Sequence, residues 1–162
     1  AVNTVKIHNG NLIGFNTDII GFRKSITRLI NKKKSALILG NGGASKAIQY
    51  TLKELGICYR IVSRGTLIDY NNLNDEIVSS CDIIINTTPL GMYPNTDTYP
   101  DINYSLINTK HLVFDLTYNP SESLFLKKAK NQGATIKNGL EMLELQAEAS
   151  WKIWNNKFKI KN

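Results

Sequence analysis

Three closely spaced glycines follow a short apolar run and give the clearest chemical signal in this 162-residue chain. Residues 36–39 are apolar, Gly40, Gly42 and Gly43 follow, and a helix-forming sequence begins at once. Gly40 can adopt backbone angles closed to other residues, and Gly42 and Gly43 have no Cβ to keep a phosphate away from the main chain. The free N–H groups at the start of a helix attract anions. The sequence therefore predicts a phosphate-binding turn between a strand and a helix.

The glycine spacing is a variant of the dinucleotide-binding fingerprint G-x-G-x-x-G/A. Counted from Gly42, Ala44 takes the middle position and Ala47 the third, whereas a count from Gly40 puts Ser45 third. Such a fingerprint is a weak signal by itself, and an ordinary strand-to-helix turn is the alternative interpretation. The surrounding segments have to decide between the two.

Ser63 and Arg64 follow the next apolar run, residues 57–62, at the place where such folds discriminate between dinucleotides. A carboxylate there would bind the ribose 2′-hydroxyl of NAD and repel a 2′-phosphate. Arg64 can instead pair with a phosphate and lay its guanidinium group on the adenine. The alternative is a surface arginine in a turn. The sequence favours NADP.

Further polar side chains fall at the expected ends of later strands. Thr87 and Met92 lie in the segment that follows residues 81–86, Tyr118 follows residues 112–116, and Gly139 follows a last short strand. Open α/β sheets bind ligands beyond the carboxyl ends of their strands. Each of these residues taken alone also suits an ordinary turn, but together they predict a lined cleft.

Apolar runs of strand length alternate with helical spacings along most of the chain. Asn9-Gly10, typical of a type I′ turn, predicts an opening hairpin of residues 2–7 and 12–14. Further strands are expected at residues 36–39, 57–62, 81–86, 112–116 and 134–137. Helices are expected from Asn16 or Thr17 to Asn31, over 44–55 and 74–78, from Ser121 or Ser123 to Gly133, and over 140–154, with 95–109 irregular. This order predicts an α/β fold with a doubly wound, mostly parallel, Rossmann-like sheet and flanking helices.

Composition narrows the classes of function. The net charge of +7 comes from lysines concentrated before the glycine strand and near the chain end, without the interleaved aromatics or recognition motif of a nucleic-acid-binding protein. No apolar run approaches the length of a membrane span. Cys58 and Cys81 stand alone, so we expect two buried thiols and neither a disulfide nor a metal site. We expect a soluble cytoplasmic protein with no nucleic-acid or membrane partner.

Six segments, in order and spacing, resemble shikimate dehydrogenase, the NADP-dependent enzyme that reduces 3-dehydroshikimate to shikimate. These are AVNTV, GFNTD-x-x-GF, GNGGASKA, NTTPLGM, DLTYNP and NGLEMLELQA, and the resemblance runs from Ala1 to about Trp154. It implies a two-domain oxidoreductase of aromatic amino acid and chorismate biosynthesis, of which this chain matches the cofactor-binding part. It also implies NADP(H) as cofactor and shikimate or 3-dehydroshikimate as substrate.

The resemblance also assigns roles to residues. Asp18 resembles the carboxylate of a catalytic lysine/aspartate dyad; otherwise it is a first-turn acidic residue favoured by the helix dipole. The implied substrate-binding residues are Asn3, Asn16, Asp18, Tyr118 and Gln146. The expected cofactor-binding residues are Gly40, Asn41, Gly42, Gly43, Ala44, Ser63, Arg64, Thr87, Met92 and Gly139.

Two departures from the family pattern qualify the assignment. The family commonly has Asn-Arg-Thr after the second strand, whereas this chain has Ser63-Arg64-Gly65 with Thr66 one place later. The substrate domain with its serine pair and catalytic lysine has no counterpart here, so we expect a fragment that is inactive alone. We expect a hinge remnant at residues 1–17, the NADP-binding domain at 18–140 and a C-terminal helix with a basic tail at 141–162.

Two alternatives remain at this point. One is a quinate/shikimate dehydrogenase that uses NAD or both cofactors. Arg64 argues against it, because position 63 beside it carries no acidic residue. The other is a stand-alone, non-catalytic nucleotide-binding module. An oligomer is possible in either case.

Overall fold

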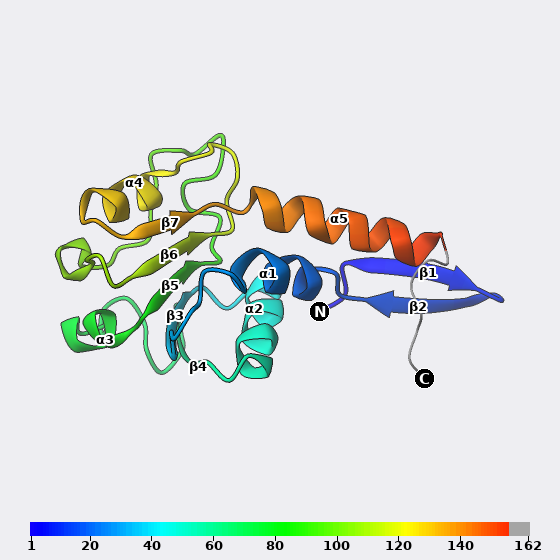
Figure 1. Cartoon of the computed structure of the whole chain (residues 1–162), viewed down its shortest axis with the longest axis horizontal. Helices are drawn as coiled ribbons and strands as arrows, with labels where there is room; N and C mark the ends of the chain where they lie inside the picture. The colour runs from blue at the N-terminus through cyan, green and yellow to red at the C-terminus, as the bar shows by residue number, and fades with distance from the viewer. Residues whose placement is uncertain (156–162) are drawn as a thin grey trace.

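A parallel sheet of five short strands carries the glycine turn. The computed structural model describes residues 1–155, and within them the strand order is β4-β3-β5-β6-β7 (Figure 1). The strands are β3 (Ser35–Leu39), β4 (Cys58–Val62), β5 (Ile83–Asn86), β6 (Leu112–Asp115) and β7 (Thr135–Lys137). Neighbouring strands are parallel throughout. The predicted α/β, Rossmann-like fold is confirmed, and the order reverses between β3 and β5, where such sheets place their ligands.

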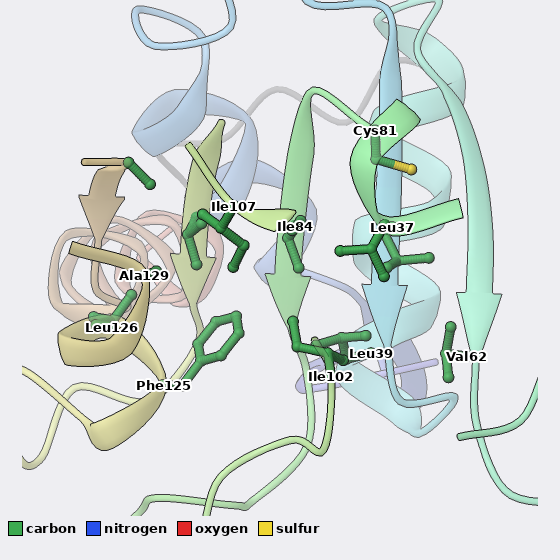
Figure 2. Close-up of a cluster of buried hydrophobic side chains, with 13 residues drawn as sticks. Leu37, Leu39, Val62, Cys81, Ile84, Ile102, Ile107, Phe125, Leu126 and Ala129 are labelled. Carbon is green, nitrogen blue, oxygen red and sulfur yellow. The ribbon is translucent and has the colours of Figure 1, made fainter. Parts of the chain in front are cut away.

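Helices cover both faces of this sheet. They are α1 (Asp18–Ile26), α2 (Gly43–Glu54), α3 (Asp75–Ser80), α4 (Leu124–Asn131) and α5 (Leu140–Trp154). Leu37 and Leu39 of β3 point to the face covered by α3 and α4, where they pack in the cluster shown in Figure 2. Ala36 and Ile38 point to the opposite face, toward α1, α2 and α5. The two-residue period of a strand therefore divides one apolar run between two cores.

The element boundaries differ from the sequence prediction at several points. Helix α1 ends at Ile26 rather than at Asn31, because the next residues form a turn in which the N–H of Leu29 donates to the carbonyl of Ile26. Helix α3 ends at Ser80 rather than at residue 78, and β5 begins at residue 83 rather than at 81. The stretch expected to be irregular contains the short 3-10 helix η1 (Tyr104–Leu106).

A hairpin stands apart from the sheet and lies beside the last helix (Figure 1). It consists of β1 (Thr4–His8) and β2 (Asn11–Phe15), which pair antiparallel. Asn9 and Gly10 have φ angles of 49° and 76°, as the predicted type I′ turn requires. The Trp154 indole N–H donates to the carbonyl of Val5 over 3.0 Å and ties α5 to the hairpin.

Two further expectations are corrected or limited by the structure. Cys81 is buried, but Cys58 is exposed because it opens the edge strand β4, so the prediction of two buried thiols is wrong for Cys58. Three lysines of the predicted basic tail (Lys157, Lys159 and Lys161) lie outside the described residues. Within residues 1–155, no helix is both long and apolar enough to cross a membrane, and no cluster of potential metal ligands occurs.

Candidate functional site

The glycine turn has the conformation that its sequence predicts. Gly40 has a φ of +106°, which only glycine adopts readily, and a Cβ there would lie 2.7 Å from Thr87 Oγ1. Two hydrogen bonds fix its backbone: its N–H donates to the carbonyl oxygen of Val62, and its own carbonyl accepts from the Ser45 hydroxyl over 2.9 Å. The turn is therefore held in place by β4 and by α2.

The start of helix α2 is open. Gly42, the N-cap residue directly before α2, has no side chain to cap the first N–H groups, and a Cβ on Gly42 or Gly43 would meet nothing within 4 Å. Lys46 adds a positive charge nearby, since its ammonium donates to Asn41 Oδ1 over 2.9 Å. Free N–H donors, a helix of 12 residues and an adjacent cation suit an anionic group.

A cavity of about 790 Å³, here called the larger cavity, opens beside this turn. It is lined by three segments at the carboxyl ends of β3, β4 and β5, namely residues 40–42, 63–65 and 87–90, and by Asp69, Tyr70, Asn71, Tyr99 and Asp101. Arg64 supplies the positive charge among these lining residues, while Asp69 and Asp101 are acidic. The Asp69 carboxylate accepts from the backbone N–H groups of Asn71 and Asn72. An anion in this cavity is therefore favoured near Arg64 and the glycine turn.

A short loop presents Arg64 to the larger cavity. The Thr66 hydroxyl lies within hydrogen-bond distance of the carbonyl oxygens of Ser63 and Ile68, at 2.7 and 2.8 Å. The N–H of Ser63 donates to the carbonyl oxygen of Ile68. Thr66, one place later than in the family pattern, thus closes a tight turn around the exposed Arg64.

A buried polar network supports the ends of β5 and β6. Asp115 is fully buried and accepts from the Ser123 hydroxyl, from the Asn86 amide over 3.0 Å and from the Thr117 N–H over 3.0 Å. Burial raises the pKa of the Asp115 carboxyl, and these hydrogen bonds partly offset the rise. Ser123 also caps α4, as predicted, so one side chain joins the strand end to the helix start. The network fixes the loops that border the site.

A second cavity of about 340 Å³, here called the smaller cavity, lies on the other side of the glycine turn. Its lining residues come from the first part of the chain, from α2 and α5, and from the segments that follow β6 and β7: Asn3, Asp18, Ala44, Leu116, Tyr118, Gly139, Met142, Leu143 and Gln146. Residues 40–42 face the larger cavity and Ala44 faces the smaller one. The first turn of α2 therefore separates two spaces that one extended ligand could occupy together.

Thr17 orients two amide side chains of the smaller cavity. The backbone N–H of Thr17 donates to Asn3 Oδ1 over 2.8 Å, and because this N–H can only donate, the Asn3 amide nitrogen points away from it. The Thr17 hydroxyl donates to Gln146 Oε1 over 3.2 Å and also contacts the Ser150 hydroxyl at 2.9 Å. The Thr4 hydroxyl completes this buried group, with its oxygen 2.7 Å from that of the Ser150 hydroxyl. The sequence left Asn16 or Thr17 as the cap of α1; the Thr17 side chain makes no capping bond, and Asn16 Oδ1 accepts the Asp18 N–H over 3.1 Å.

Asp18 is a partly buried carboxyl at the start of α1. Burial raises the pKa of the Asp18 carboxyl above its ordinary value, and hydrogen bonding to the Asn3 side chain lowers it in part. No lysine lines the smaller cavity among the described residues. A carboxylate, two oriented amides and the Tyr118 hydroxyl suit a ligand with several hydroxyl groups.

The predicted site residues divide into three groups. Gly40, Asn41, Gly42, Ser63, Arg64 and Thr87 line the larger cavity. Asn3, Asp18, Ala44, Tyr118, Gly139 and Gln146 line the smaller one. Gly43, Asn16 and Met92 line neither, and the Asn16 amide donates to the carbonyl of Ala1.

Several lining residues were not among the predicted ones. Tyr70 and Tyr99 belong to loops whose sequence carries no periodic signal, and Leu116 and Met142 were expected only as core or helix positions. Whether a loop residue lines a cavity depends on contacts that are distant in sequence. The local sequence pattern therefore gave no signal for these four residues.

Comparison with known proteins identifies relatives of the chain. No family model matches the chain. It is 44% identical to a shikimate dehydrogenase (NADP(+)) of Methanococcus aeolicus over 95% of this chain and 62% of that protein. The chain is a homologue of shikimate dehydrogenases. The alignment spans about 62% of the length of these relatives.

Solved structures agree with this homology. A chorismate mutase/shikimate 5-dehydrogenase fusion protein from Clostridium acetobutylicum superposes with a TM-score of 0.83 at 37% identity, covering 100% of this chain and 63% of that one. Shikimate 5-dehydrogenase from Thermus thermophilus, solved in complex with NADP(H) and shikimate, gives a TM-score of 0.84 at 30% identity, covering 96% and 62%. As a shikimate dehydrogenase homologue, the chain corresponds to the NADP-binding region of these enzymes.

Proposed function

We propose that this chain is the cofactor-binding part of an enzyme that reduces 3-dehydroshikimate to shikimate with NADPH. The observation that carries the proposal is the larger cavity, which joins the uncapped start of α2 to Arg64 at the end of β4. The diphosphate of the dinucleotide would lie at residues 40–42, and its 2′-phosphate would lie at Arg64. The open space where a Gly42 Cβ would stand supports this fit.

The smaller cavity supports the proposed substrate. Bound NADPH supplies the hydride for the carbonyl carbon of the substrate. The Asn3 and Gln146 amides, oriented by Thr17, would donate to substrate oxygens, and Tyr118 and Gly139 would border the place where the two ligands meet. Asp18 would accept a hydrogen bond from a substrate hydroxyl and hold the ammonium partner that delivers the proton to the carbonyl oxygen.

Residues 1–155 supply no such ammonium group to the smaller cavity. We therefore propose that the acid/base lysine comes from the part of the enzyme that the chain does not match in its relatives. We also propose a boundary near residue 17, since the hairpin lies apart from the sheet, and a cofactor domain running from 18 to 140.

The purified 162-residue chain is expected to bind NADPH but to oxidise shikimate with NADP⁺ at a negligible rate. Titration followed by nicotinamide fluorescence measures the binding, and absorbance at the NADPH band measures turnover. A Gly42→Ala variant tests the proposed position of the diphosphate, because its Cβ meets nothing within 4 Å in the protein but enters the space proposed for the diphosphate. This variant should stay folded, with a small loss of thermal stability because alanine is a poorer N-cap residue than glycine, and should lose NADPH affinity. Rapid shikimate oxidation by the chain alone would contradict the proposed division of labour.

A further inference from the structure

Tyr99 stands out among the residues that line the larger cavity, because its ring is held by neighbouring side chains while 38% of the residue stays exposed. It lies on the loop that follows β5, in the stretch whose sequence gave no structural signal. Arg64 and the glycine turn line the same cavity. The proposed phosphate contacts leave the base of the dinucleotide without an assigned protein surface beyond Arg64.

The Tyr99 ring is fixed from behind by a series of contacts that reaches the core. Lys128 of α4 places its ammonium over the ring, 4.4 Å from the centroid. Tyr104 meets the ring edge-to-face at 6.0 Å, and Tyr104 in turn contacts the fully buried Phe125 at 6.2 Å. The Tyr104 hydroxyl donates to the carbonyl of Pro100 over 2.8 Å. The ring is therefore in place before any ligand arrives.

The residues that hold Tyr99 lie outside the set that lines the larger cavity. Lys128 lies 5.4 Å from the Tyr104 centroid as well as 4.4 Å from that of Tyr99, so Lys128, Tyr104 and Tyr99 form a compact triangle. Neither Lys128 nor Tyr104 lines the larger cavity, whereas Tyr99 does. The part of Tyr99 that lines the cavity is therefore available to a planar ligand.

We propose that Tyr99 is the stacking platform for the adenine of the bound dinucleotide. The inference rests on the proposed function, since it assigns the base within the same cavity. Stacking on an aromatic face needs no hydrogen-bonding pattern and costs little ordering when the ring is already fixed. Lys128 acts through Tyr99 as a positioning residue, because it contacts the ring but does not itself line the larger cavity.

The test compares Tyr99→Ala, Tyr99→Phe and wild type by calorimetric titration with NADPH, NADH and 2′-phospho-ADP-ribose. Tyr99→Ala should weaken all three by a common factor of about ten to a hundred, because each ligand carries the adenine. Tyr99→Phe should bind like wild type, since the ring face and not the hydroxyl does the stacking. Tyr50→Ala, which removes an exposed tyrosine of α2 outside the cavity, is the matched control and should change nothing.

Different failures have different meanings. If the wild type binds no dinucleotide, the proposed function itself is wrong. If the wild type binds NADPH and Tyr99→Ala binds it equally well, only the role of Tyr99 is wrong. A loss confined to NADPH, or an equal loss in Tyr99→Phe, would also overturn the stacking proposal. Thermal unfolding of each variant separates a binding effect from a folding effect.

Discussion

Alanine at position 139 is expected to destabilise the fold by about 3 kcal/mol or more. Gly139 is buried directly before α5, and its N–H donates to the carbonyl oxygen of Thr117 over 3.1 Å. A Cβ there would lie 2.0 Å from the carbonyl oxygen of Leu116, well inside contact distance. The obstacle is backbone at the end of β6, which cannot swing aside as a flexible side chain can. Either α5 or the strand end has to shift.

Urea unfolding of Gly139→Ala measures this effect. Gly43→Ala is the control, since its Cβ meets nothing within 4 Å and alanine is the better helix former. The control should unfold at or above the wild-type midpoint. A Gly139→Ala midpoint equal to that of wild type would show that the strand end moves freely, and Gly139 would then matter only for the ligand.

Replacing Arg64 with glutamine is expected to weaken NADPH binding by about 10- to 100-fold and to leave NADH binding nearly unchanged. A hydrogen-bonded charge pair between guanidinium and phosphate is worth roughly 1.5–3 kcal/mol, and NADH lacks the phosphate. Arg64 is exposed at the mouth of the cavity, so the difference should also shrink as salt concentration rises.

Fluorescence titrations with both cofactors at two salt concentrations measure the change in preference. Arg28→Gln removes the same charge from an exposed position that lines neither cavity, and it should preserve the wild-type preference. An equal loss of both cofactors in Arg64→Gln would show that this arginine contacts the adenine alone.

The parts of the site that are local in sequence could be predicted from it. The strand before Gly40, the conformation of the turn and the start of α2 depend on residues within a few positions of one another. Arg64 was predictable for the same reason, because it follows β4 directly. The resemblance to shikimate dehydrogenase added residues that no local rule identifies, such as Asn3 and Gln146.

The remaining parts depend on contacts between distant segments. Thr17 has the sequence context of a helix cap, yet its hydroxyl is buried against Ser150. Tyr99 reaches the cavity only because Tyr104 and Lys128 hold it there. The exposure of Cys58 follows from the place of β4 at the edge of the sheet, which the order of strands along the chain does not specify.

The two cavities become complete at different moments in the synthesis of the chain. Every residue that lines the larger cavity falls between positions 40 and 101, whereas the smaller cavity needs residues from Asn3 to Gln146. The bond between Thr4 and Ser150 closes a loop that spans nearly the whole chain, which is entropically the most expensive kind of contact to form early. During synthesis, all residues that line the larger cavity are therefore made first, and the smaller cavity is complete only when α5 returns to the hairpin.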